Sequence, residues 1–205
     1  MDLYDHPDCP YGMKVRIVLA EGGLDYDMKP VDLQAGQHRQ ADFLELNPFG
    51  RVPVLVDDEI VVYDSTIINE YLNEEYLPPD EALLPEDSGQ RAVARMLEEY
   101  ADVAFTLPGM AIERELGKSS IDRDQQRFAT AQDVIKKGLV MLERELEGKE
   151  YLVGTFGLAD VAFAPTVVQL DKLGVVVDSS TSGVKAWINR LAERPSIGTV
   201  VKLVA

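Results

Sequence analysis

The sequence is poor in the residues that build disulfides and metal sites. Its 205 residues include one cysteine, Cys9, and two histidines. A single cysteine excludes an intramolecular disulfide and any metal site made of several cysteines, so no metal cofactor is expected. Because the chain does not rely on disulfides, the cytoplasm is the expected compartment.

Long hydrophobic runs are also missing. No stretch approaches the roughly 18 uninterrupted apolar residues of a membrane span. The opening residues, MDLYDHPDC, lack the basic and apolar regions of a signal peptide. The 46% hydrophobic content is typical of a soluble globular protein, so we expect no membrane partner.

Basic residues are outnumbered by acidic ones. The chain has 36 Asp and Glu against 20 Lys and Arg, which gives a formal net charge of −16. A field of this sign repels the phosphates of nucleic acids, so direct binding of DNA or RNA is not expected. The acidic residues are scattered, as in LERELEGKE, and this pattern indicates solvated helix faces.

The first part of the chain alternates strand and helix signals. Residues 1–5 form a strand candidate, Pro10 opens an amphipathic helix that stops at Gly22-Gly23, and residues 24–33 alternate like a strand. Two strands joined through a helix pair in parallel, with a right-handed crossover. This pattern predicts a β-α-β unit.

A second group of elements completes this part of the chain. A short helix is expected over 41–46, a hairpin with strands at 54–56 and 60–62, and an amphipathic helix from Asp64. The order β-α-β-α-β-β-α over residues 1–77 predicts a thioredoxin-like α/β domain. The apolar side of its last helix is expected to consist of Ile67, Ile68, Tyr71 and Leu72.

The remainder of the chain is predicted to be helical. Residues 78–88 are rich in proline and acid and are predicted to be a linker. Strand signals nearly vanish after it, which predicts an all-α domain over 89–205. Its helices are expected over about 88–116, 121–147, 158–173 and 184–193, and after Pro195. The third of them is apolar around most of its circumference and should be the buried centre of the domain.

Two residues of this half are expected to serve folding rather than chemistry. Asp160, three residues after Gly157, is predicted to cap the central helix by accepting from the backbone. Trp187 is predicted to pack in the core.

Tyr100, Phe105 and Met110 are candidates for lining an acceptor pocket between the domains, and they fit core positions equally well.

Three stretches together resemble the cytosolic glutathione transferase superfamily. They are LYDHPDCPYGMKVRIVLAEGGLDY at 3–26, NPFGRVPVLVDDEIVVYDSTIINEYL at 47–72 and GLADVAFAP at 157–165. The resemblance covers essentially the whole chain. It implies a thioredoxin-like domain followed by an all-helical one, a homodimer, and glutathione as a substrate with no metal.

The resemblance also implies a glutathione site. It implies a cis bond between Val52 and Pro53, with the Val52 backbone pairing with the cysteinyl part of glutathione as an added strand. The helix that starts at Asp64 and Ser65 offers amides and a hydroxyl to the γ-glutamyl carboxylate. The family usually has Glu in place of Asp64, which would meet the amine. The implied glutathione-binding residues are Cys9, Tyr11, Arg39, Val52, Pro53, Asp64 and Ser65.

Two of these assignments involve a choice between neighbours or roles. Arg39 is preferred over His38 for the glycyl carboxylate because arginine is always charged, and His38 is interpreted as solvated. Asp64 fits a plain helix cap as well as a ligand for the amine. Tyr11 is expected to pack rather than supply a catalytic hydroxyl.

Cys9 falls on the active-site turn of the family, and Pro10-Tyr11 continue the pattern of its omega-like class. A cysteine at a helix N-terminus is expected to have a lowered pKa and to act as the catalytic nucleophile. A lone thiol can form a mixed disulfide with glutathione, which a second glutathione then resolves. The alternative is an inert core thiol.

Two functions follow from these residues. The first is a glutathione-dependent transferase or thiol transferase that uses Cys9. The second is the role of the stringent starvation protein A group, a non-catalytic branch of the superfamily that associates with RNA polymerase. VRIVLAEGGL, IINEYLNEEYLPP and LDKLG resemble that branch. Cys9, Arg39 and Asp64-Ser65 favour the enzyme, and the acceptor substrate stays open.

Overall fold

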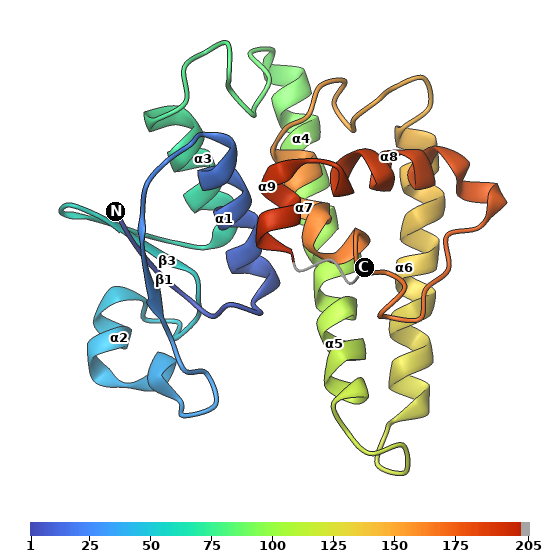
Figure 1. Cartoon of the computed structure of the whole chain (residues 1–205), viewed down its shortest axis with the longest axis horizontal. Helices are drawn as coiled ribbons and strands as arrows, with labels where there is room; N and C mark the ends of the chain where they lie inside the picture. Colours follow the sequence, from blue (N-terminus) through green and yellow to red (C-terminus); the bar gives the residue numbers. More distant parts are fainter. Residues whose placement is uncertain (202–205) are drawn as a thin grey trace. The chain divides into compact units, whose positions relative to one another are not determined.

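The computed structural model describes residues 1–201 and shows two compact units, Met1–Ala82 and a second unit that begins at Leu83. Figure 1 shows a small sheet with helices in the first unit and helices in the second. The first unit is thus mixed α/β and the second mostly helical, as the sequence predicts. None of the helices within residues 1–201 is long and apolar enough to cross a membrane.

The first unit is built on a four-stranded mixed sheet with the strand order β2-β1-β3-β4. Strands β1 and β2 are parallel, with Leu3 opposite Met28, and the two pairs β1–β3 and β3–β4 are antiparallel. The strands are β1 (Asp2–Asp5), β2 (Asp27–Pro30), β3 (Val54–Asp57) and β4 (Ile60–Tyr63), and the helices are α1 (Pro10–Glu21), η1 (Gln37–Arg39), α2 (Ala41–Leu46) and α3 (Ser65–Glu75).

Apolar side chains of the strands and of α1 and α3 form the core of this unit. Leu3, Ile17, Leu55 and Ile68 are fully buried. Ile67, expected on the apolar side of α3, is instead 54% exposed. The reason is helical geometry, since residues 67 and 68 lie about 100° apart around the helix axis and only one of them points into the core.

The second unit consists of helices and turns. Two isolated β-bridges, Tyr151–Gly154 and Val153–Thr155, are its only β pairings among the residues up to 201. The elements are α4 (Ser88–Ala101), the π-helical η2 (Asp102–Thr106), α5 (Leu107–Leu116), α6 (Gln125–Glu145), α7 (Leu158–Val167), η3 (Ser179–Thr181), α8 (Ser182–Ala192) and α9 (Pro195–Val200).

Two helix boundaries differ from the prediction. The expected helix over 88–116 is interrupted by the π-helical η2, whose buried Phe105 packs against Phe163 with ring centroids 5.0 Å apart. The central helix α7 ends at Val167 rather than near 173, two residues after Pro165. Beyond this point the Nε2 of Gln169 donates to the carbonyl of Pro165 at 2.9 Å, so a side chain satisfies a carbonyl of the last helical turn.

Helix α7 is the centre of the second unit, and all ten of its residues are buried. Asp160, on its first turn, accepts hydrogen bonds from the amides of Gly157 and Leu152, each 3.1 Å long. The Nε1 of the fully buried Trp187 donates to the same carboxylate at 2.8 Å. The predicted cap and the predicted core tryptophan are both confirmed, and one carboxylate joins them.

We expect Asp160→Ala to destabilise the protein by about 3–5 kcal/mol, because three buried donors would lose their acceptor. Urea unfolding followed by circular dichroism measures this. The control is Asp133→Ala on α6, where the aspartate side chain is 61% exposed in a surface ion pair with Lys137. That change should cost less than about 1 kcal/mol. Equal losses in both variants would contradict the role given to Asp160.

Candidate active site

Cys9 lies between β1 and α1, at the position that precedes the first helical residue. Its amide donates to the carbonyl of His6 and its carbonyl accepts from the amide of Met13, both at 2.9 Å. The amides of Tyr11 and Gly12 face its sulfur. These contacts fix the thiol at the helix start, and only 9% of the residue is exposed.

The pKa of Cys9 is opposite to the prediction. Burial raises it to about 11, and the negative charge of Asp5 acts in the same direction. The amides of Gly12 and Tyr11 and the charge of Arg16 lower it, but by less. The expected stabilisation of a thiolate by helix amides therefore exists, and burial beside a carboxylate outweighs it.

Asp5 is a residue of this site that the sequence reasoning missed. It ends β1, is fully buried, and forms an ion pair with Arg16 of α1, with 3.2 Å between Oδ2 and Nε. The backbone amide of His6 and the Arg16 side chain face its carboxylate. Burial raises its pKa to about 6, against the opposing charge of Arg16. A signal was present, because Asp5 lies two residues from Leu3 and therefore on the same, buried face of the strand.

Gly12 adjoins both Asp5 and Cys9. A Cβ on Gly12 would lie 1.9 Å and 2.0 Å from the two carboxylate oxygens of Asp5. No side chain fits there without displacing the carboxylate. The absence of a Cβ thus lets the Asp5 carboxylate lie against the first turn of α1, near the amide that faces the Cys9 sulfur.

The strand register brings the other predicted residues to the same end of the sheet. Val54 pairs with Tyr4 and with Tyr63, so Val52-Pro53 and Asp64-Ser65 lie beyond that end, where β1 leads into Cys9. The Val52–Pro53 peptide bond is cis, as the resemblance implies. Within the described residues the Val52 backbone forms no hydrogen bond.

Asp64 is the N-cap of α3, as the local sequence predicts. Its Oδ1 accepts from the amides of Thr66 at 3.0 Å and Ile67 at 3.4 Å, and its backbone has a φ of 76°. Non-glycine residues rarely adopt such an angle. The Asp64 side chain is exposed while Ser65 is buried.

The segment that carries Arg39 leaves the same end of the sheet, because β2 is parallel to β1. Arg39 is exposed in η1. His38 is half-buried rather than solvated as predicted, and its Nδ1 atom is buried. Its carbonyl lies against the turn at Gly50, where a Cβ would be 2.8 Å from it. Tyr11 is half-buried and packs as expected, with the Lys14 Nζ 5.2 Å from its ring centroid.

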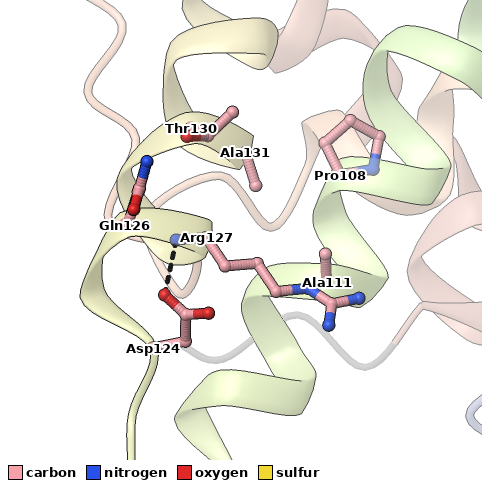
Figure 2. Close-up of a pocket in the computed structure, with 7 residues that line it drawn as sticks. All are labelled: Pro108, Ala111, Asp124, Gln126, Arg127, Thr130 and Ala131. Carbon is pink, nitrogen blue, oxygen red and sulfur yellow. Dashed lines mark hydrogen bonds between the residues drawn. The ribbon is translucent and has the colours of Figure 1, made fainter.

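Two pockets are lined by none of the predicted glutathione-binding residues. One of about 430 Å³ in the second unit lies between α5 and the start of α6, where the Asp124 side chain accepts from the Arg127 amide at 2.9 Å (Figure 2). Another of about 380 Å³ in the first unit is lined by residues that include Tyr4, Lys29 and Phe43. Of the three acceptor-lining candidates, Phe105 is fully buried and belongs to the core.

Comparisons with known proteins agree with this fold. Residues 1–74 match the N-terminal domain of glutathione S-transferases and residues 91–195 match the C-terminal domain. Glutathione S-transferase 3 of Zea mays is 32% identical over 98% of this chain and 93% of its own length. The chain therefore belongs to the glutathione S-transferase family.

The chain is also similar to a second curated relative and to a solved structure. A stringent starvation protein A homolog of Haemophilus influenzae is 32% identical over 96% of this chain and 87% of its own length. The theta class glutathione S-transferase of Xanthomonas axonopodis pv. citri, solved with glutathione bound, has the same fold. Its TM-score is 0.88 at 22% identity, over 100% of this chain and 97% of that one.

We expect Cys9 to react slowly with iodoacetamide in the ligand-free protein. A pKa raised from 9.0 to about 11 lowers the thiolate fraction at pH 7 by roughly a hundredfold, since each unit is tenfold. Mass spectrometry of the alkylated chain between pH 6 and pH 9 measures the rate. The same chain in urea is the control, and an equal rate at pH 7 in both states would contradict the raised pKa.

Proposed function

We propose that this protein is a glutathione-dependent transferase in which Cys9 meets the sulfur of bound glutathione. The single observation that carries the proposal is the sheet register, which gathers Cys9, the Val52-Pro53 turn and the start of α3 at one end of the sheet. This is the constellation that a γ-glutamyl tripeptide requires, with a partner for its backbone, its γ-glutamyl carboxylate and its thiol.

Each remaining part of glutathione has a candidate partner. The Val52 backbone pairs with the cysteinyl unit like an added strand. The Ser65 hydroxyl and the first amides of α3 bind the γ-glutamyl carboxylate, and Asp64 binds the amine through the oxygen that does not cap the helix. The exposed Arg39 binds the glycyl carboxylate.

The raised pKa of Cys9 favours one of two roles for its thiol. A group that stays protonated at neutral pH donates a hydrogen bond to the glutathione thiolate, which then attacks an electrophile. A nucleophile for mixed disulfides would need the thiolate form instead. Conjugation is therefore the proposed main reaction, and thiol transfer a second reaction of the same site.

Cys9 variants separate the two reactions. Cys9→Ala should slow conjugation of glutathione to a chloronitroaromatic electrophile by about a hundredfold, because the donor to the thiolate is lost. Cys9→Ser should retain conjugation, since a hydroxyl is also a donor, and lose transfer from a glutathione mixed disulfide. Both rates are measured spectrophotometrically.

Calorimetric titration with glutathione provides the binding control. Ser65→Ala should weaken binding, whereas Ser88→Ala, at the equivalent first position of α4, should not. Full conjugation activity in Cys9→Ala would refute the role of Cys9. A protein that binds no glutathione at all would refute the proposed function and favour the non-catalytic regulatory role of the stringent starvation protein A group, to which the 32% identity also points.

The family resemblance implies a homodimer, and exposed apolar side chains support this. The N-terminal unit exposes Phe49, whose ring contacts Tyr63 with 5.9 Å between centroids, and also Val61, which shares a face of β4 with Tyr63. Contiguous exposed apolar surface of this kind marks interaction sites. The second unit exposes an apolar row along α4, η2 and α5, namely Val93, Met96, Val103 and Leu107.

We expect sedimentation equilibrium to give about 45 kDa, twice the chain mass of 22.7 kDa. Phe49→Ser should weaken the dimer. Ile121→Ser is the control, because Ile121 is 93% exposed and belongs to neither apolar group. A wild-type mass near 23 kDa at micromolar concentration would exclude the dimer.

A further inference from the structure

The buried cluster of Asp5, Cys9 and Arg16 contains a carboxylate that the proposed reaction does not use. Asp5 is 0% exposed, and its carboxylate has Arg16 as an ion-pair partner and the backbone amide of His6 beside it. An ionised group in this position is costly to bury. Its position next to the first turn of α1 therefore calls for a role in the site.

The local geometry places the Asp5 carboxylate close to Cys9. Its carboxylate occupies the space where Gly12 would carry a Cβ, and the Gly12 amide faces the Cys9 sulfur. The Arg16 guanidinium is held in place because it also donates to the carbonyl of Pro7 at 2.6 Å. One cation, one carboxylate and one thiol therefore share a single buried region.

Other charged groups on the neighbouring elements are engaged elsewhere. Lys29 of β2 forms ion pairs with Asp2 and Asp27, at the opposite end of the sheet. Asp57 of β3 accepts from the hydroxyls of Tyr71 and Tyr76. On α1 itself, Lys14 lies against the ring of Tyr11. Arg16 is thus the charged group that faces Asp5 directly.

Charge balance acts on the thiol in the same direction as burial. With Asp5 ionised, Arg16 is already neutralised, and a Cys9 thiolate would add an unbalanced buried anion. With Asp5 neutral, the thiolate would itself balance Arg16. The cluster therefore favours a single negative charge, and Asp5 and Cys9 titrate as a coupled pair.

We propose that the charge of Asp5 adds to burial in holding Cys9 in its protonated form, and that Asp5 thereby favours hydrogen bonding to glutathione over nucleophilic attack by Cys9. Asp5 is a positioning residue in this scheme, since it acts through Cys9 and touches no substrate. The second half of the statement rests on the proposed function, whereas the first half concerns the ligand-free protein alone.

The test compares three variants by the rate of Cys9 alkylation with iodoacetamide at pH 8.5, each normalised to the same chain in urea. Asp5→Asn should lower the pKa of Cys9 and raise the rate at least about threefold per pKa unit, because reduced nucleophilicity offsets about half of the tenfold gain in thiolate. Arg16→Gln should lower the rate. Asp8→Asn is the matched control, because this exposed aspartate adjoins Cys9 in sequence and is screened by solvent.

If electrostatics control the thiol, the alkylation rate rises in Asp5→Asn and falls in Arg16→Gln. Loosened packing would instead raise the rate in both variants. A change of the alkylation rate in the same direction in both variants, or an unchanged rate in Asp5→Asn, would overturn the proposal. Should Asp5→Asn fail to fold, Arg16→Gln decides, because a rate at or above the wild-type rate contradicts the charge balance.

The effect of Asp5 on the reaction is tested separately, by the ratio of the two reaction rates. Asp5→Asn should raise the ratio of thiol transfer to conjugation, and an unchanged ratio would overturn the selection by Asp5. Failure of Cys9→Ala to lose activity would refute the proposed function while leaving the alkylation result for Asp5 intact.

Discussion

The register of the N-terminal sheet is the constraint on which the candidate site depends. Because β1 pairs in parallel with β2 and antiparallel with β3, three loops leave the sheet at the end where β1 leads into Cys9. The β3–β4 hairpin brings Asp64 and Ser65 to the same place. Since a shift of one residue would turn every side chain to the opposite face, the buried alternation fixes both the core and the site.

At that end of the sheet, two effects act against each other on the one thiol of the chain. Helix amides favour the thiolate, while burial and the carboxylate of Asp5 favour the thiol, and the second pair prevails. The omega-like cysteine pattern therefore does not by itself make a reactive nucleophile. The chemistry of Cys9 depends on its buried surroundings as much as on its position at a helix start.

The C-terminal unit is organised around α7. Asp160 joins the start of that helix to the preceding turn and to α8 through Trp187, and the rings of Phe105 and Phe163 pack beside it. Family membership accounts for both units, and the chain is 32% identical both to a glutathione S-transferase and to a stringent starvation protein A homolog.

The sequence by itself determined the type and order of the elements, the cap at Asp160, the core position of Trp187 and the glutathione S-transferase resemblance, because periodicity, caps and turn residues act locally. Only the tertiary structure decided which of Ile67 and Ile68 is buried, where the helices of the second unit break, and the role of Asp5. It also decided the protonation of Cys9, because a pKa depends on groups that folding brings together. Asp5, Gly12 and Arg16 are separated along the chain, and only the packing of α1 on β1 places them around one buried thiol.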